Sequence, residues 1–318
     1  MITPHRPGER GPRTPRIHEL DAVRGLALCG IMVVNTWQHT RGELADKARL
    51  PIDLAVENLL QSRFYPIFSF LFGISLVLFL RSSGGDRKAL LRRLIVLAAF
   101  GFLHTMVNPG EVLLPYALFG LVVLLPASFM PRFAVLLLGL GMTGWAVMLG
   151  GGVILVPGLF LLGMAAMEYR PSPRLVLPVF LVSAPLAVVL GYLWAFTAAG
   201  GRMAALYPLS GLAAALAYGT GLLLLLRTPL RGPLTWALNP LGRMALTNYV
   251  LSTPVILLSL PLLAADPTRL AGFGLSAVTI AAQIAFSRWW LARYRYGPLE
   301  WVWRCLTWGE FVRNKLDR

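Results

Sequence analysis

The sequence predicts an all-α protein, a polytopic transmembrane helical bundle of about ten spans with the N-terminus and the C-terminus in the cytoplasm. Of its 318 residues, 57% are hydrophobic and only 14% are charged, and the mean hydropathy is +0.67. A soluble domain carries about 25% charged residues. Because a membrane span needs roughly 20 apolar residues, ten spans leave room for short loops and for no separate soluble domain.

Ten apolar segments are long enough, or nearly long enough, to cross a bilayer. The segments that correspond to the third, fourth and sixth spans are short, and a re-entrant or strongly tilted helix is an option for one of them. The predicted spans are residues 21–38, 64–80, 92–107, 112–126, 133–150, 153–168, 175–197, 207–226, 241–264 and 271–292.

The distribution of basic residues orients these spans. Most of the 29 Lys and Arg residues lie in the two tails and in every second loop, and Arg24 and Arg243 fall inside spans. Cytoplasmic loops are enriched in Lys and Arg, so this pattern predicts an even number of spans and cytoplasmic termini. It also explains the net charge of +15 without a nucleic-acid partner, because no soluble basic module is present to bind one.

Three regions follow from this organisation. Residues 1–16 form a basic tail rich in Pro and Gly, which predicts disorder in the cytoplasm. Residues 17–293 form the transmembrane domain. Residues 294–318 interleave Trp301, Trp303 and Trp308 with Arg295 and Arg304, which is typical of an amphipathic cytoplasmic segment at the lipid headgroups.

Ionisable side chains inside spans carry the functional argument, because each costs at least a few kcal/mol of insertion free energy, roughly 2.5 or more at a helix centre. In the first span, Asp21 precedes Arg24 by three residues and can pair with it. Asn35 lies three turns beyond Arg24 on the same helix face, and His39 follows Asn35 at i+4. The alternative is that Asp21 and Arg24 only dock this helix and that His39 is an interfacial residue.

A second cluster joins the third and fourth spans. His104 ends the third span, residues 108–110 (Asn-Pro-Gly) predict a turn, and Glu111 opens the fourth span. The turn would bring His104 and Glu111 together, and a carboxylate beside an imidazole suits general acid–base chemistry. The alternative is that Glu111 interacts only with the dipole of its own helix.

A third cluster lies in the segment 239–249, which enters the ninth span from the cytoplasm. Arg243 sits one turn inside and can either contact a phosphate or reach the headgroups. Asn248 and Tyr249 follow it, and Asn248 can also serve as an interhelical hydrogen-bonding residue.

In the second span, the aromatic run 64–72 ends at Gly73, where the missing side chain allows close helix approach.

Motifs for several common reactions are absent from the sequence. It has no CxxC or HExxH metal site, no phosphate-binding loop of the GxxxxGK[ST] type and no GxSxG nucleophile. Four His residues, one of them in the N-terminal tail, argue against a metalloenzyme, and we expect no metal ligands.

Several of these runs together resemble the YeiB-type bacterial membrane proteins, which are largely uncharacterised. The matching runs occur in family order at residues 20–31 with Asn35, 68–73, 101–104 with 110–113, 242–249 and 296–301. That family is similar to the transmembrane acyltransferases, which include the lysosomal heparan-α-glucosaminide N-acetyltransferase. The Asp21, Arg24, Gly25 and Asn35 pattern resembles theirs. His39 stands closer to Asn35 than their catalytic His does, and His104 fits the YeiB-type pattern better, with Glu111 where that pattern often has Asp.

The resemblance implies transfer of an acyl group, acetyl in the first instance, from cytoplasmic acyl-CoA to a glycan, lipid or small-molecule acceptor. On this hypothesis acetyl-CoA is a donor substrate and no cofactor is tightly bound. Arg24, Arg243, Asp21, Asn248 and Tyr249 would hold the donor, and His104, Glu111, His39 and Asn35 would carry the chemistry. A continuous tunnel from Arg24 to His104 would favour acyl transfer, and a packed core between them would count heavily against it.

Two other functions stay open at this point. The many Gly and Pro residues, 31 and 23, also suit the broken helices of a small-solute transporter or exporter, and a non-catalytic membrane scaffold is the third option. Membrane lipids are the expected surroundings, the cytoplasmic (inner) membrane of a bacterium is the expected location, and a homodimer is an option that the sequence leaves open.

Overall fold

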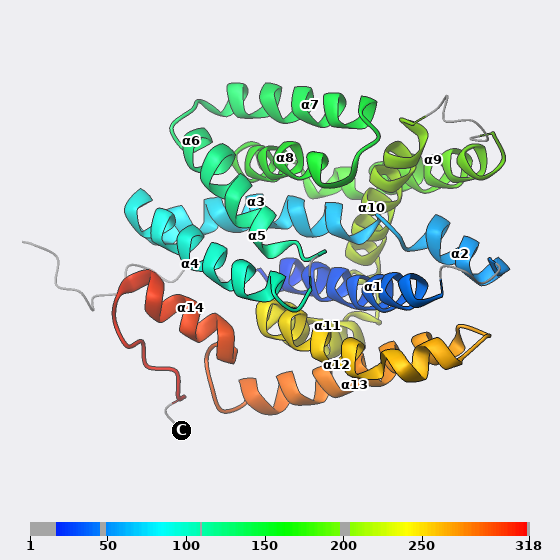
Figure 1. Ribbon diagram of the computed structural model, residues 1–318. Helices are drawn as coiled ribbons and strands as arrows, with labels where there is room; N and C mark the ends of the chain where they lie inside the picture. The colour runs from blue at the N-terminus through cyan, green and yellow to red at the C-terminus, as the bar shows by residue number, and fades with distance from the viewer. Residues whose placement is uncertain (1–16, 45–48, 109, 198–203, 317–318) are drawn as a thin grey trace, which may run out of the picture.

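The architecture is helical throughout the part of the chain that the structure describes. The computed structural model describes residues 17–44, 49–108, 110–197 and 204–316, and Figure 1 shows their arrangement. These ranges contain helices and one isolated antiparallel bridge between Tyr294 and Lys315. The predicted disorder falls on residues 1–16, which lie outside the described residues. The helical class is confirmed for the described residues.

The helices follow one another with short connections. Residues 113–127 form two α-helical pieces joined by a π-helical turn, Gly120–Leu124, and short 3₁₀ turns precede α8 and α9. The α-helices are α1 (His18–Glu43), α2 (Pro51–Leu59), α3 (Phe64–Ser82), α4 (Arg87–Thr105), α5 (Leu113–Phe119), α6 (Leu125–Ala127), α7 (Arg132–Met148), α8 (Leu155–Tyr169), α9 (Val176–Thr197), α10 (Leu206–Leu225), α11 (Arg231–Arg243), α12 (Ala245–Ala265), α13 (Leu270–Leu291) and α14 (Pro298–Trp308).

Seven helical segments among the described residues are long and apolar enough to cross a membrane. They contain α1, α3, α8, α9, α10, α12 and α13. The third, fourth and fifth predicted spans correspond to α4, to α5 and α6 together, and to α7, and these are shorter or more charged. The protein is therefore a helical membrane protein with seven candidate spans, and the count of ten stays a prediction.

Glycine residues allow the central helices to meet backbone to backbone. A Cβ atom built on Gly73 of α3 would meet the Phe160 carbonyl oxygen of α8, and one on Gly163 of α8 would meet that of Phe70. The close approach predicted at Gly73 is confirmed. On α1, Gly25 lies equally close to the backbone of α11. Helix α1 thus lies in the middle of the bundle, in contact with α3, α11, α12 and α13 (Figure 1).

The ninth predicted span begins later than expected. A single helix was predicted from residue 241, but the chain turns at Met244, whose φ and ψ angles are −112° and 37°. Arg243 therefore belongs to the last turn of α11 and lies outside α12. The physical reason is a cap from the distant helix α14, since the Glu300 carboxylate accepts hydrogen bonds from the backbone N–H groups of Leu246 and Thr247 at 2.8 and 3.0 Å.

Two short helices lie at opposite ends of the bundle (Figure 1). The C-terminal amphipathic segment forms α14, which packs against α4 and α12. At the other end, the Trp37 indole N–H of α1 donates to Asp53 of α2 at 3.0 Å, and the Asp53 carboxylate also lies 3.6 Å from Arg269. We call the end of the bundle where α14 lies the α14 end, and the end where α2 lies the α2 end.

Candidate functional site

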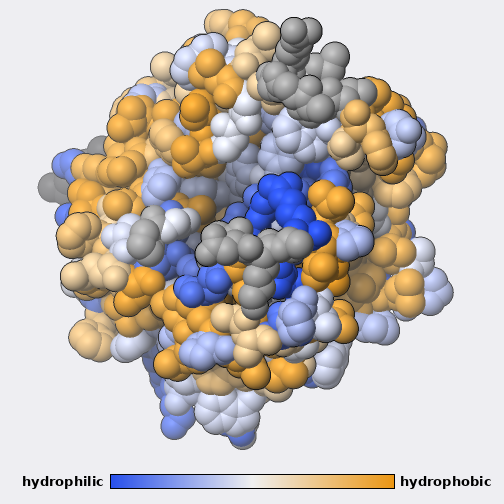
Figure 2. All heavy atoms as spheres, turned by 45° about the vertical axis from the view of Figure 1, so that its right-hand side comes forward, coloured by the Kyte–Doolittle hydropathy of each residue, from blue (hydrophilic) through white to orange (hydrophobic). Residues whose placement is uncertain are grey.

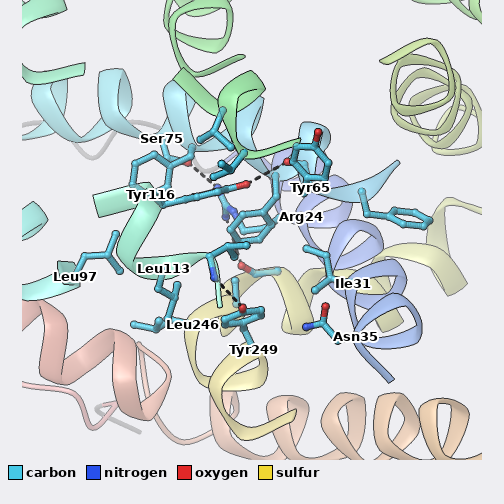
Figure 3. A pocket seen from close by; sticks show the side chains of 18 of the residues that line it. Arg24, Ile31, Asn35, Tyr65, Ser75, Leu97, Leu113, Tyr116, Leu246 and Tyr249 are labelled. Atoms are coloured by element: carbon cyan, nitrogen blue, oxygen red, sulfur yellow. Dashed lines mark hydrogen bonds between the residues drawn. The ribbon is translucent and has the colours of Figure 1, made fainter. Parts of the chain in front are cut away.

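A cavity of about 480 Å³ lies inside the bundle. Its walls come from α1, α3, α4, α5, α8, α11, α12 and α14, and most of the lining side chains are apolar or aromatic. Figure 3 shows part of the lining, with Arg24, Tyr65, Tyr116 and Tyr249 around the opening. Ligand pockets in proteins commonly measure about 300–1,000 Å³, so this cavity is the candidate site.

One face of α1 forms a wall along the length of the cavity. Arg24, Ile31, Asn35 and Gln38 all line it. At a rise of about 1.5 Å per residue, Arg24 and Asn35 lie roughly 16 Å apart along the helix. Arg24 and Asn35 thus line one elongated cavity with the apolar Ile31 between them, whereas Asp21 and His39 of the same helix do not line it.

The α14 end of the cavity is basic, because Arg24, Arg93 and Arg243 all line it. Arg24 donates to Asp21 at 3.1 Å and to the Ser75 hydroxyl of α3 at 2.8 Å. The predicted Asp21–Arg24 pair is thus present. Asp21 itself is buried and does not line the cavity.

Two lining residues at this end were missed by the sequence reasoning. In the sequence, Arg93 is one of the basic residues at the start of the third predicted span, and no signal there distinguishes it from the exposed Arg92. Glu300 is held by three hydrogen bonds at the N-terminus of α12, including one from the Thr247 hydroxyl at 2.6 Å. Burial raises the pKa of the Glu300 carboxyl above its ordinary value, against these hydrogen bonds, which lower it.

Among the described residues, the side chains that line the α2 end of the cavity are polar but uncharged. Asn35, Gln38 and Ser62 line it together with Tyr65, whose hydroxyl donates to the Gly152 carbonyl at 3.1 Å. Gln38 is exposed. Figure 2 shows hydrophilic residues gathered in the middle of the face at this end, within a hydrophobic surround.

His104 and Glu111 meet as predicted, with 3.4 Å between His104 Nδ1 and Glu111 Oε2. Both are buried, and neither lines the cavity. Glu111 also accepts from the backbone N–H groups of Leu113 and Leu114, each at 2.6 Å, so it caps the start of α5. His104 Nε2 lies 2.9 Å from the Thr253 hydroxyl of α12. The pair therefore joins α4, α5 and α12, and its catalytic role stays a prediction.

Tyr249 separates His104 from the cavity. Its ring lies 5.4 Å from the His104 ring, centre to centre, in an edge-to-face contact. Its hydroxyl accepts from the Val112 N–H at 3.4 Å, and Tyr249 lines the cavity (Figure 3). The cavity extends from Arg24 to Tyr249 and stops short of His104, whose ring contacts Tyr249, so the open path from Arg24 to His104 is not formed among the described residues.

The remaining predicted residues lie outside the lining. Asn248 is buried, and its side-chain amide donates to the Ser287 hydroxyl of α13 at 3.1 Å. Its position supports the interhelical alternative. His39 is half-buried near the end of α1 and does not line the cavity. Asn35, Arg24, Arg243 and Tyr249 are thus the predicted residues that the structure brings together around one space.

The fold and the cavity define a helical membrane protein with an internal, elongated site that is basic at one end. Residues 166–310 match the family model described as a protein of unknown function, DUF418. A protein of Bacillus acidopullulyticus, the "uncharacterized 39.9 kDa protein in amylase 3'region", is 33% identical over 93% of this chain and 94% of its own length. The chain belongs to this family of uncharacterised proteins.

A second relative matches over a shorter region. The uncharacterised protein YxaH of Bacillus subtilis strain 168 is 31% identical over 137 residues, which cover 37% of this chain and 34% of that protein. No solved structure is similar to the chain at a significant level.

Proposed function

We propose that the protein is a transmembrane acyltransferase, which takes an acyl group from acyl-CoA in the cytoplasm and delivers it to an acceptor at the α2 end. The observation that carries this proposal is the cavity itself, with three arginines at one end and uncharged polar groups at the other. Acetyl-CoA is the donor that we propose first. The acceptor is a hydroxyl or amine of a glycan, a lipid or a small molecule.

The orientation belongs to this proposal. We place both termini and the α14 end in the cytoplasm of a bacterial cell, with ten spans crossing its cytoplasmic membrane. Contacts between loops support the arrangement, because segments predicted on the same side touch one another. Arg81 pairs with Glu168 at 2.9 Å, and Arg227 donates to the Pro173 carbonyl at 2.8 Å.

The donor fits the cavity by its chemistry. Arginine side chains bind phosphate through planar pairs of N–H donors, so the phosphates of CoA belong at Arg24, Arg93 and Arg243. The apolar middle, which includes Phe68, Phe72 and Leu97, suits a pantetheine arm. Such an arm would bring the thioester close to Asn35 and Tyr249.

The reaction itself needs a general base and a hydrogen-bond donor to the thioester oxygen. The acceptor's hydroxyl oxygen would attack the thioester carbon, a C–O bond would form, and the C–S bond would break. The hydroxyl proton would end on the sulfur of released CoA. Asn35 would donate a hydrogen bond to the carbonyl oxygen. His104 stays the predicted base, and this role requires its ring to exchange Thr253 for the acceptor.

An assay of CoA release tests the proposal. Purified protein in nanodiscs should release free CoA thiol from acetyl-CoA in the presence of a suitable glycan or lipid acceptor. Asn35→Leu should lower the rate by about 100-fold or more, as loss of an oxyanion donor does. Asn58→Leu should not, because Asn58 is a half-buried amide on α2 that does not line the cavity and whose side-chain nitrogen donates within its own helix. Absence of acetyl transfer to every glycan and lipid tested would refute the enzyme.

Transport of a small solute is the second candidate. The same observation favours it, because the cavity is lined by residues from both ends of α1 and binding sites of transporters lie near the bilayer midplane. A transporter would move a solute into proteoliposomes without covalent change. Acyl transfer would instead leave a labelled acetyl group on the acceptor.

A further inference from the structure

We propose that Arg93 is the residue that binds a phosphate group of the ligand at the basic end of the cavity, and that Trp303 of α14 positions it. The inference rests on the proposed function in one respect, since that function makes the ligand a phosphate-bearing one. It names a binding residue that neither the sequence motifs nor the family resemblance singles out.

Arg93 is fixed by aromatic rings. The central carbon of its guanidinium lies 3.6 Å from the centre of the Trp303 ring and 5.0 Å from that of Phe79. The Trp303 indole N–H donates to the Arg93 backbone carbonyl at 2.8 Å, which ties the two residues together a second time. Rings that hold the planar face of a guanidinium leave its N–H groups at the edge available for a ligand.

The other two arginines of the lining already serve the chain itself. Arg24 donates to Asp21 and Ser75, and Arg243 donates to the Arg295 carbonyl at 3.3 Å. The Arg93 side chain differs, because it has no hydrogen bond and no carboxylate within 4.0 Å among the described residues. None of its guanidinium nitrogens is fully buried among the described residues. Because Arg93 lines the cavity, these nitrogens are open to it.

A phosphate is the chemical group that this environment selects. Arginines on α1, α4 and α11 converge on one end of a partly apolar cavity, where charge–charge attraction is stronger than in water. Hydrogen bonds between a guanidinium and a phosphate are shorter and stronger than those between neutral groups. Arg93 could form such bonds to a ligand without breaking a hydrogen bond within the described chain, whereas Arg24 and Arg243 would have to give one up.

Binding of soluble phosphates measures this role apart from catalysis. Protein in nanodiscs of phosphatidylcholine alone should bind inorganic pyrophosphate and 3′,5′-ADP, followed by isothermal calorimetry, and CoA should compete with both. Arg93→Ala should weaken binding about tenfold or more, the ratio that corresponds to about 1.4 kcal/mol. Arg93→Lys should fall between, because Lys lacks the planar pair of donors.

Neighbouring variants serve as controls. Arg92→Ala removes the adjacent, exposed cation and should leave binding unchanged within about twofold. Trp303→Leu should weaken binding while Trp303→Phe retains most of it, which a purely electrostatic role of Arg93 would not produce. Unfolding midpoints confirm that each variant is folded.

Three results bear on the inference. It is overturned if folded Arg93→Ala or Arg93→Lys protein binds pyrophosphate and 3′,5′-ADP as tightly as the unchanged protein. Binding that depends on Arg93 but is seen only when phosphatidylglycerol in the nanodisc is titrated supports the phosphate site and assigns it to a lipid headgroup. Binding of CoA that depends on Arg93, without any acetyl transfer, supports the inference and refutes the enzymatic proposal.

Discussion

Replacing Gly73 with alanine should cost the protein about 3 kcal/mol of stability, at the upper end of the range for overpacked cores. The new Cβ would meet the Phe160 carbonyl oxygen and approach the Met164 backbone nitrogen. Neither atom belongs to a flexible side chain, so α3 and α8 must move apart. Both helices also contribute to the cavity wall, α3 through Phe72 and α8 through Val156. Ligand binding should therefore weaken together with stability.

Gly144→Ala is the matched control on α7. Nothing lies within 4 Å of a Cβ atom at Gly144, and alanine is favoured over glycine inside a helix by about 1 kcal/mol. Unfolding of both variants in the same detergent, followed by circular dichroism, gives the comparison. A Gly73→Ala protein as stable as the Gly144→Ala protein would contradict the backbone contact between α3 and α8.

Glu111→Ala is expected to destabilise the protein by about 3 kcal/mol, because buried donors that lose their acceptor cost about 1–3 kcal/mol each. The carboxylate is buried and accepts from the N–H groups of Leu113 and Leu114 at the start of α5. It also contacts His104. Its removal would loosen the joint between α4 and α5 that forms one wall of the cavity.

Glu168→Ala supplies the reference for an ordinary ion pair. Glu168 pairs with Arg81 at 2.9 Å, and both side chains are about one third exposed. Surface pairs of this kind contribute about 0–1 kcal/mol. If chemical denaturation gives the Glu111→Ala and Glu168→Ala proteins equal stability, the capping role assigned to Glu111 is wrong.

Features of the fold and the site could be predicted from the sequence where the residues that determine them are close along the chain. Hydropathy located the apolar helices, and i, i+3 spacing placed Asp21 beside Arg24. The turn after α4 brought His104 to Glu111, and the single small residue Gly73 marked a close contact. Each of these rests on helix periodicity or on a local turn, which a single sequence displays directly.

The features of the site that could not be predicted depend on contacts between residues that are distant along the chain. The end of α11 at Arg243 could not be predicted, because the cap of α12 comes from Glu300, more than 50 positions later. The orientation of Arg93 into the cavity depends on Trp303 of α14. The position of His104 behind Tyr249 depends on its contacts with Thr253 and Tyr249 of α12, both more than 100 positions later. None of these pairings has a periodic signal.

Transfer across the membrane tests the central proposal most directly. Proteoliposomes with the α14 end outside should be given [¹⁴C]acetyl-CoA externally and the acceptor inside, and labelled acceptor inside the vesicles should then be measured. The proposal predicts labelled acceptor only when acetyl-CoA is supplied on the α14 side, with free CoA released on that same side. Label that appears equally from either side, or none with any glycan or lipid acceptor, would contradict it.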